Sequence, residues 1–151
     1  MELFRLCREK HSHSLNASGV ANRWNKENEF VIYAGSSRSL STLEMLVHRN
    51  SIKILDSYKM LVISVEDKKN TIVSLSLNDL PSNWKKLEAY SDLQFIGSDW
   101  YQNKKSLLLK IPSAVIDQEF NFIINTLHSD FRKNVELLYK ENYCWDDRLV
   151  S

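Results

Sequence analysis

The stretch Asn22–Glu44, NRWNKENEFVIYAGSSRSLSTLE, contains the strand and the helix around which the rest of the fold can be placed. FVIYA, residues 30–34, is rich in β-branched and aromatic side chains and predicts a short strand. GSSRS follows as a turn and helix cap, and apolar residues then recur at helical spacing, which predicts a helix over about 38–49. The same stretch carries Arg23, Tyr33 and Glu44, which raises the question of whether these side chains meet at one ligand.

Further elements are expected on both sides of this unit. Apolar runs predict strands at 3–7, 59–66, 71–77, 106–115 and 119–124. Asp67–Asn70 predicts a polar hairpin turn between the strands at 59–66 and 71–77. Pro112 indicates a sheet edge or a bulge within its strand. Helices are expected near 82–90 and 91–103, and the tail 129–150 holds a short amphipathic segment.

These elements predict a single α+β domain over residues 1–151. The chain has 151 residues, 43% of them hydrophobic, which is enough for one core, and no linker, repeat or low-complexity tract divides it. Strands outnumber helices and do not alternate regularly with them. We therefore expect a compact domain with a mixed or antiparallel sheet and flanking helices, and not a doubly wound sheet.

Charge and hydropathy give no reason to expect direct contacts with nucleic acid or with membranes. The 20 basic and 19 acidic residues nearly cancel, whereas nucleic-acid binding usually shows as a basic excess. The N-terminal segment lacks the apolar core of a secretory signal, and no apolar run approaches the roughly 20 residues of a membrane-spanning helix. We therefore expect a cytoplasmic protein, in which Cys7 and Cys144 are free thiols.

Common cofactor and catalytic motifs are missing from the sequence. Cys7, His11 and His13 are residue types that bind metals, but no fourth ligand accompanies them, so no metal site is predicted. Glycine-rich phosphate loops and the G-x-S-x-G elbow are also absent. A ligand that carries phosphate would therefore have to be held by side chains.

Each candidate polar residue has a structural interpretation beside a functional one. Glu44 lies at the edge of the apolar stripe of its helix, where it is either a solvated flanking carboxylate or a group pointed into a cleft. Arg23 is either a surface cation beside Trp24 or a fork of donors for phosphate or carboxylate. Tyr33 is either a core tyrosine with a satisfied hydroxyl or part of a site, and Ser113 is either a turn cap or part of a site.

The order of these residues resembles one family, the RES-domain toxins, which are named for arginine, glutamate and serine. LFRL resembles the opening segment of the family with its arginine, NRWN resembles its R-W-N motif, and VIYAGSSRSLSTLE resembles its tyrosine strand and glutamate helix. Later motifs of the family are matched in the same order by DLPSNW, LQFIGSDW, LLLKIPSAV, NFIINTLHSDF and WDDRL. The resemblance therefore runs almost from end to end of the chain.

The resemblance implies a fold of the ADP-ribosyltransferase toxin type and the degradation of NAD⁺ by cleavage of its nicotinamide–ribose bond. It implies the toxin of a type II toxin–antitoxin system, held by an Xre-type helix-turn-helix antitoxin that covers the active site and supplies any contact with DNA. NAD⁺ is then a substrate, no cofactor is expected, and water and inorganic phosphate are alternative acceptors. A homodimer within the toxin–antitoxin complex is compatible with this expectation.

Carried over by position, the resemblance assigns five residues to the site. Glu44 would stabilise positive charge that develops on the ribose. Arg23 and Arg5 would hold the pyrophosphate, and Tyr33 would stack on the nicotinamide ring. Ser113 would bind a ribose hydroxyl or phosphate, or position the acceptor. Glu44, Tyr33 and Arg23 are the residues assigned to catalysis.

Two positions depart from the family pattern, and two other functions remain as alternatives. Asn22 stands where a glycine often precedes the arginine, which bears on how closely the backbone approaches a phosphate, and Thr126 stands where a proline is common. An ADP-ribosyltransferase that modifies a macromolecule would use a similar site. A non-catalytic binding partner would keep the fold without turnover. The joint presence of Arg23, Tyr33, Glu44 and Ser113 favours an enzyme.

Overall fold

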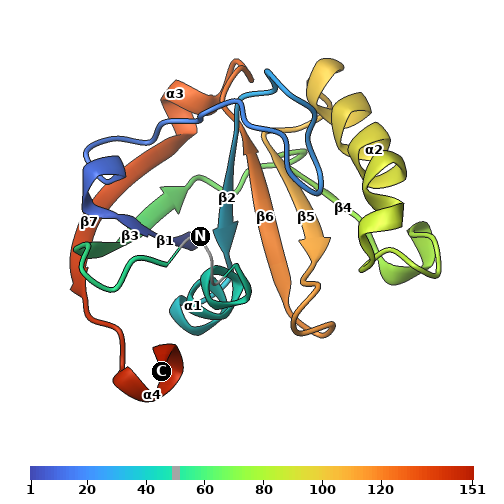
Figure 1. Ribbon diagram of the computed structural model, residues 1–151. Helices are drawn as coiled ribbons and strands as arrows, with labels where there is room; N and C mark the ends of the chain where they lie inside the picture. The colour runs from blue at the N-terminus through green and yellow to red at the C-terminus, as the bar shows by residue number, and fades with distance from the viewer. Residues whose placement is uncertain (49–51) are drawn as a thin grey trace.

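The fold is built on a seven-stranded sheet with strand order β4-β5-β6-β2-β1-β3-β7 (Figure 1). The computed structural model describes residues 1–48 and 52–151. The strands are β1 (Glu2–Arg8), β2 (Val31–Gly35), β3 (Tyr58–Val65), β4 (Ile72–Ser74), β5 (Leu108–Pro112), β6 (Phe120–Asn125) and β7 (Val135–Tyr143). β4 pairs with β5 in parallel, and the other neighbouring strands pair antiparallel, which confirms the predicted α+β class with a mixed sheet.

The helices lie around this sheet. Those of α type are α1 (Arg38–Val47), α2 (Tyr90–Gln102), α3 (Phe131–Asn134) and α4 (Asp147–Val150). Short 3-10 helices are η1 (Glu9–His11), η3 (Leu77–Asp79) and η4 (Leu87–Ala89). In Figure 1, α1 lies below β2, and α2 lies to the right, beyond β6 and β5. Among the described residues, no helix has the length and apolar character needed to cross a membrane.

The predicted strand–helix unit is confirmed as β2 followed directly by α1. The hydroxyl of Ser37 accepts a hydrogen bond from the Leu40 N–H at 3.0 Å, which caps the helix. A Cβ atom added at Gly35 would lie 3.1 Å from the backbone nitrogen of Ser41, so glycine allows the helix to start close to the strand. The predicted end of the helix at residue 49 lies outside the described residues.

β1 and β2 separate soon after they meet. They pair only where Phe4 lies opposite Gly35, whereas β1 pairs with β3 along its whole length. In Figure 1, β1 extends to the left, away from the steeply drawn β2. The buried N–H of Leu6 donates to the Ser41 hydroxyl at 2.8 Å, so a side chain of α1 satisfies a backbone group in the diverging strand. This divergence makes room for the cavity described below.

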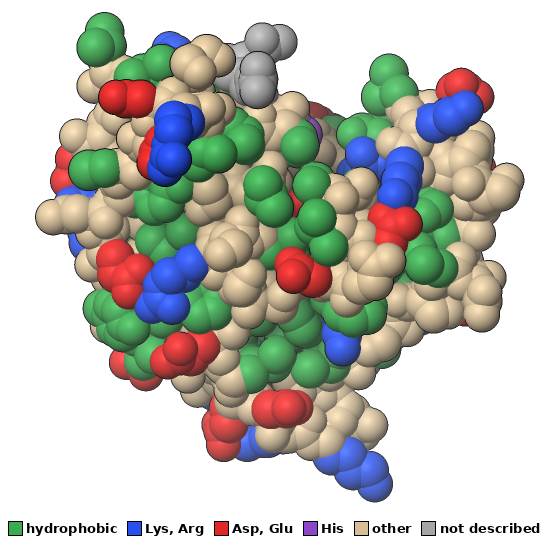
Figure 2. Space-filling model, turned by 90° about the horizontal axis from the view of Figure 1, so that it is seen from below, with side chains coloured by type: hydrophobic (Ala, Val, Ile, Leu, Met, Phe, Trp, Pro, Cys, Tyr) green, Lys and Arg blue, Asp and Glu red, His purple; other side chains and the backbone are tan. Residues whose placement is uncertain are grey.

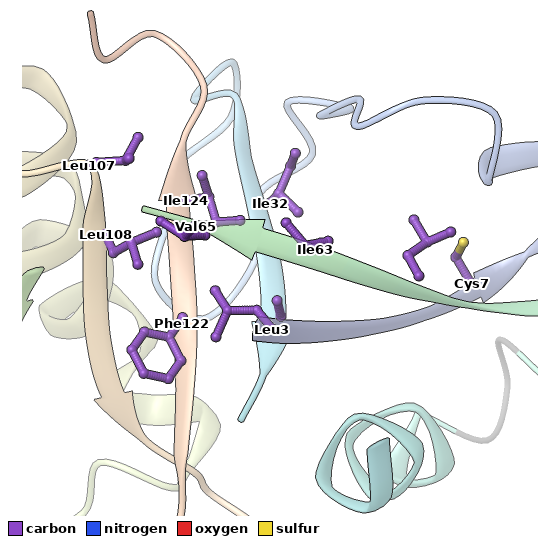
Figure 3. Close-up of a cluster of buried hydrophobic side chains, with 11 residues drawn as sticks. Leu3, Cys7, Ile32, Ile63, Val65, Leu107, Leu108, Phe122 and Ile124 are labelled. Carbon is purple, nitrogen blue, oxygen red and sulfur yellow. The ribbon is translucent and has the colours of Figure 1, made fainter. Parts of the chain in front are cut away.

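Apolar side chains fill both faces of the sheet. One cluster joins β1, β2, β3, β5 and β6, and Figure 3 shows its labelled members Leu3, Ile32, Ile63, Phe122 and Ile124. A second cluster packs α2 and the tryptophans Trp24, Trp84 and Trp100 against the opposite face. Complete burial of one such aliphatic side chain stabilises a fold by about 1.5–3 kcal/mol. The positions of the cavity walls are therefore fixed by a core that extends across the whole sheet.

The hairpin predicted between residues 59–66 and 71–77 is wrong. β3 and β4 do not form a hairpin, because β3 lies between β1 and β7 while β4 pairs in parallel with β5. β7 lies within the tail and was not predicted, because charged residues on this edge strand obscure the apolar alternation. Pro112 is the last residue of β5 and pairs there with Phe120 of β6 alone, because β4 pairs only with residues 108–110, so the sheet edge predicted at this position is confirmed.

The helix predicted near 82–90 is also wrong, since only the short η4 forms there. The other predicted helix, over 91–103, is confirmed as α2. The cysteines Cys7 and Cys144 are free, as predicted. On the face seen in Figure 2, acidic and basic side chains are interspersed, in keeping with 20 basic and 19 acidic residues in the chain.

Candidate active site

A cavity of about 650 Å³ lies where β1 and β2 diverge. Its lining comes from β1, from β2, from α1, from the loop residues 18 and 20–22, and from single residues of other elements. Sites for small molecules commonly measure about 300–1,000 Å³, so this cavity is large enough for a cofactor-sized ligand. Three of the five assigned residues line it, namely Arg5, Tyr33 and Glu44.

Glu44 projects from α1 into this cavity and is held there by two hydrogen bonds. The Oε1 atom of Glu44 accepts from the Ser113 hydroxyl at 2.7 Å and from the Asn121 side-chain amide at 2.6 Å. Its other carboxylate oxygen, Oε2, has no hydrogen-bond partner within residues 1–48 and 52–151. Of the two interpretations of Glu44, the structure shows a carboxylate pointed into a cleft, with one oxygen fixed and one available.

Arg5 brings a positive charge to the same cavity from β1. The guanidinium is half-buried and makes no hydrogen bond or ion pair with any residue that the structure describes. Burial lowers the pKa of Arg5, although an arginine still carries its charge at neutral pH. A half-buried charge without a partner is unfavourable in the unliganded protein, so this position is suited to an anionic ligand.

Tyr33 lines the cavity with its ring, while its hydroxyl is engaged elsewhere. The hydroxyl donates to Oδ1 of Asn25 at 2.6 Å and accepts from the N–H of Trp24 at 3.2 Å. Burial is the main cause that raises the pKa of Tyr33, so the phenol stays protonated at neutral pH. The arrangement fits an aromatic wall and an anchor for the turn at residues 22–25, and it leaves no proton for acid–base chemistry.

Arg23 does not join the other residues at the cavity. Its Nη1 atom donates to the backbone carbonyls of Trp84 at 2.9 Å and Lys85 at 3.1 Å. Its guanidinium carbon lies 4.8 Å from the centroid of the Tyr90 ring. The side chain thus ties the turn at residues 22–25 to the segment before α2, and the expected convergence of three residues holds for Tyr33 and Glu44 alone.

Ser113 reaches the site only through Glu44. It is fully buried and is not part of the cavity lining. Its oxygen accepts hydrogen bonds from the N–H groups of Val115 at 3.0 Å and Ile116 at 3.1 Å, so its own proton is left for Glu44. The residue is therefore both a turn cap and a support for the carboxylate, and in this geometry it does not touch a ligand directly.

The two departures from the family pattern have simple structural outcomes. Asn22 lines the cavity, and its side-chain oxygen accepts from the Arg23 N–H at 2.8 Å. It is not among the described residues with positive φ, so its backbone needs no glycine. Thr126 donates its hydroxyl to the Phe30 carbonyl at 2.5 Å and its N–H to the same oxygen at 3.3 Å, two bonds that a proline would lack.

Sequence reasoning missed one polar residue of the site, Asn121. The residue lies in β6, lines the cavity and contacts Glu44. In the sequence, the position of the polar Asn121 inside the apolar run FNFII was the one indication of a special role. Across residues 1–48 and 52–151, no group of three or more histidine, cysteine, aspartate or glutamate residues is arranged to hold a metal ion.

Comparison with known proteins places this cavity in a family context. The family model described as RES domain matches residues 2–146. A protein named Toxin Res from Photorhabdus laumondii is 32% identical over 155 residues, which cover 100% of this chain and 98% of that protein. A Toxin Res from Yersinia enterocolitica is 30% identical and covers 99% of both chains. The Prs ADP-ribosylating toxin of a Sphingobium species is 30% identical over 85% of this chain and 80% of its own.

A solved structure with a similar fold is the M. tuberculosis MbcT–MbcA toxin–antitoxin complex, in which the matched chain superimposes with a TM-score of 0.78. The match covers 95% of this chain and 84% of that one at 16% identity, so it concerns the fold alone. The sequence matches extend over nearly the whole chain, and the match to the family model alone covers residues 2–146. The chain therefore belongs to the RES domain family.

Proposed function

We propose that this protein is the toxin of a type II toxin–antitoxin system and that it depletes NAD⁺ by cleaving the nicotinamide–ribose bond. The observation that carries the proposal is that Arg5 and Glu44 line the same cavity. Arg5 has no partner among the described residues, and the Glu44 carboxylate is fixed through Oε1 while Oε2 stays available. NAD⁺ offers both matching charges, because its pyrophosphate is anionic and its ribose becomes cationic as the bond breaks. Membership of the RES domain family and relatives named as toxins support the same conclusion.

Glu44 acts on the ribose in this proposal. When the bond between ribose carbon 1 and the nicotinamide nitrogen breaks, its electron pair leaves with nicotinamide and positive charge spreads over the ribose. A carboxylate already fixed by two hydrogen bonds stabilises that charge without having to reorganise. The free Oε2 atom can accept a bond from a ribose hydroxyl, which would hold the sugar against the carboxylate.

Arg5 takes the role of anion anchor, for which the sequence had offered both Arg5 and Arg23. Its guanidinium provides donors in a planar fork that suits pyrophosphate, and a bound anion would relieve the cost of its unpaired burial. The ring of Tyr33 supplies an apolar wall for the flat nicotinamide cation. No cofactor takes part in this scheme, because NAD⁺ is the substrate.

The acceptor is water or inorganic phosphate. Water gives ADP-ribose and a released proton, whereas phosphate gives ADP-ribose 1-phosphate. Purified protein should be incubated with NAD⁺ in the presence and in the absence of phosphate, and the products should be identified by mass spectrometry. Phosphate-independent ADP-ribose indicates a glycohydrolase, a phosphorylated product indicates a phosphorylase, and intact NAD⁺ under both conditions contradicts the proposal.

A second candidate is transfer of ADP-ribose to a macromolecule, which is favoured by the relative named Prs ADP-ribosylating toxin. It would use the same Glu44 and Arg5 and would differ in the acceptor alone. NAD⁺ labelled in its adenylate part distinguishes the two activities. Label that becomes bound to protein or nucleic acid in a lysate supports transfer, and label that stays in small molecules supports depletion.

The partner in this proposal is an Xre-type antitoxin that covers the cavity in the cytoplasm. The fold neighbour was solved as a toxin–antitoxin complex, which supports a partner of this general class. Co-expression with the antitoxin should restore growth and NAD⁺ levels, and light scattering of the purified complex should show whether the toxin forms a homodimer within it. Failure of any such partner to suppress toxicity would contradict this part.

A further inference from the structure

We infer that Asn121 is a positioning residue that sets the orientation of the Glu44 carboxylate. The inference rests on the proposed function, in which that carboxylate faces the ribose. The Asn121 amide nitrogen lies 2.6 Å from Oε1 of Glu44, and the Ser113 hydroxyl lies 2.7 Å from the same atom. Both bonds converge on one oxygen, so they fix the plane of the carboxylate and direct Oε2 away from the two donors.

The two donors differ in how they are exposed. Ser113 is fully buried, whereas Asn121 is half-buried and lines the cavity. Asn121 therefore lies where a ligand and Glu44 meet, and Ser113 lies behind the carboxylate. A change at Asn121 alters the site itself, while the Ser113 bond remains to keep Glu44 near its place.

The backbone around Asn121 is rigid on both sides. β6 lies between β2 and β5, with Asn121 opposite Gly35 on one side and Ile111 on the other. Gly35 is also the residue against which α1 begins, because its missing Cβ leaves room for Ser41. The strand that carries Asn121 and the helix that carries Glu44 thus meet at one fixed point of the sheet, as a preorganised site requires.

The variant Asn121→Asp distinguishes a positioning role of Asn121 from a purely structural one. In Asn121→Asp, a second carboxyl group replaces the amide that is hydrogen-bonded to Glu44, and each of the two carboxylates raises the pKa of the other. When the introduced carboxyl group is ionised, it repels Glu44. When it is protonated, it can donate the bond that the amide donated. Activity should therefore recover as the pH falls through the raised pKa of the pair, and it should fall again when Glu44 is protonated too.

The experiment measures NAD⁺ turnover of the purified full chain between pH 4 and pH 9. We expect kcat of Asn121→Ala to fall about 10- to 100-fold, with a smaller change in KM. A factor of this size corresponds to the loss of one hydrogen bond to a charged group. Asn121→Asp should be similarly poor at neutral pH and should gain at least several-fold at acidic pH relative to the parent. The matched control is Asn142→Asp, the same change at an exposed position of β7 beside Lys59, which should leave the pH profile unchanged.

Two results would overturn the inference. One is an Asn121→Ala protein that keeps the parental kcat, and the other is an Asn121→Asp protein whose pH profile has the parental shape. Thermal unfolding of each variant shows whether a lost rate reflects a lost fold. If the parent itself does not consume NAD⁺, the proposed function fails, yet the pKa of the Glu44 carboxyl measured by NMR in the parent and in Asn121→Asp still tests the contact. An unchanged pKa there would contradict the positioning role.

Discussion

Arg5 and Glu44 carry opposite charges into the same cavity but form no ion pair with each other. Among the described residues Arg5 has no hydrogen-bond or ion-pair partner, while Glu44 is held through one oxygen by Ser113 and Asn121. Proteins rarely leave a half-buried cation unpaired when a carboxylate lines the same cavity, because pairing would reduce the cost of burial. The separation keeps both groups available to a ligand that has an anionic and a cationic part, and it is the structural basis of the following predictions.

Glu44→Gln should abolish most NAD⁺ turnover while the fold is kept. The amide oxygen of glutamine can still accept bonds from Ser113 and Asn121, but the negative charge that stabilises the ribose cation is lost. Loss of one such electrostatic contribution costs about 10²–10³-fold in kcat. The measurement is kcat with thermal unfolding as the fold check, and Glu88→Gln, at an exposed position of η4, is the control. A parental rate in Glu44→Gln would remove Glu44 from the mechanism.

Arg5→Met should weaken NAD⁺ binding without lowering stability. Methionine keeps an unbranched apolar side chain and removes a buried, unpaired charge, so the melting temperature should stay the same or rise. The KM for NAD⁺ should rise more than tenfold, because a charge-assisted bond to phosphate contributes about 1.5–3 kcal/mol. Calorimetric titration with ADP-ribose checks the binding alone. Unchanged affinity would show that the pyrophosphate lies elsewhere.

Arg23→Ala should act on the turn at residues 22–25 and not on the anion subsite. Its bonds to the carbonyls of Trp84 and Lys85 would be lost, which should lower stability by about 1–3 kcal/mol. The KM should change much less than in Arg5→Met. Chemical denaturation and kinetics on the same samples compare the two variants directly. A large rise of KM with no loss of stability would instead restore Arg23 as a ligand for phosphate.

Tyr33→Phe should cost stability and leave the chemistry nearly intact. The change removes the bonds to Asn25 and Trp24 and leaves buried polar groups unsatisfied, at a cost of about 1–3 kcal/mol, but it preserves the aromatic wall. Tyr33→Ala should lose the wall as well and raise KM. Denaturation and kinetics of both variants distinguish the contribution of the Tyr33 hydroxyl from that of its ring. A drop in kcat of Tyr33→Phe at parental stability would show that the hydroxyl takes part in the reaction.

Gly97→Ala should be among the most disruptive changes outside the cavity. A Cβ atom there would lie 1.7 Å from the carbonyl oxygen of Trp24, so α2 or the turn at residues 22–25 must move. Overpacking of this kind costs about 1–3 kcal/mol. Ser91→Ala, at an exposed position of the same helix, is the control for helix propensity. Both are compared by thermal unfolding, and equal stability of the two variants would contradict the described contact.

The parts of the fold that depend on local patterns could be predicted from the sequence. FVIYA followed by a capped helix predicted β2 and α1, because strand propensity, capping and helical spacing all act within a few residues. The partner of β4 and the existence of β7 could not be predicted, because a short strand and a charged edge strand are stabilised by long-range pairing.

The candidate site divides in the same way. The position of Glu44 at the edge of the apolar stripe of α1 could be predicted from helix geometry, and the structure places it in the cavity. The direction of the Arg23 side chain could not, because it depends on carbonyl groups 61 and 62 residues away in the chain. Asn121 was missed for a similar reason, since its contact with Glu44 spans 77 residues.

Cleavage at this site is measured most directly as the release of nicotinamide from NAD⁺ by the purified protein and by Glu44→Gln under identical conditions. We expect the parent to release nicotinamide together with one equivalent of ADP-ribose or its 1-phosphate, and Glu44→Gln, although folded, to release at least about a hundredfold less. No nicotinamide from the folded parent, or equal release by both proteins, would show that the cavity between β1 and β2 does not cleave NAD⁺ with the Glu44 carboxylate.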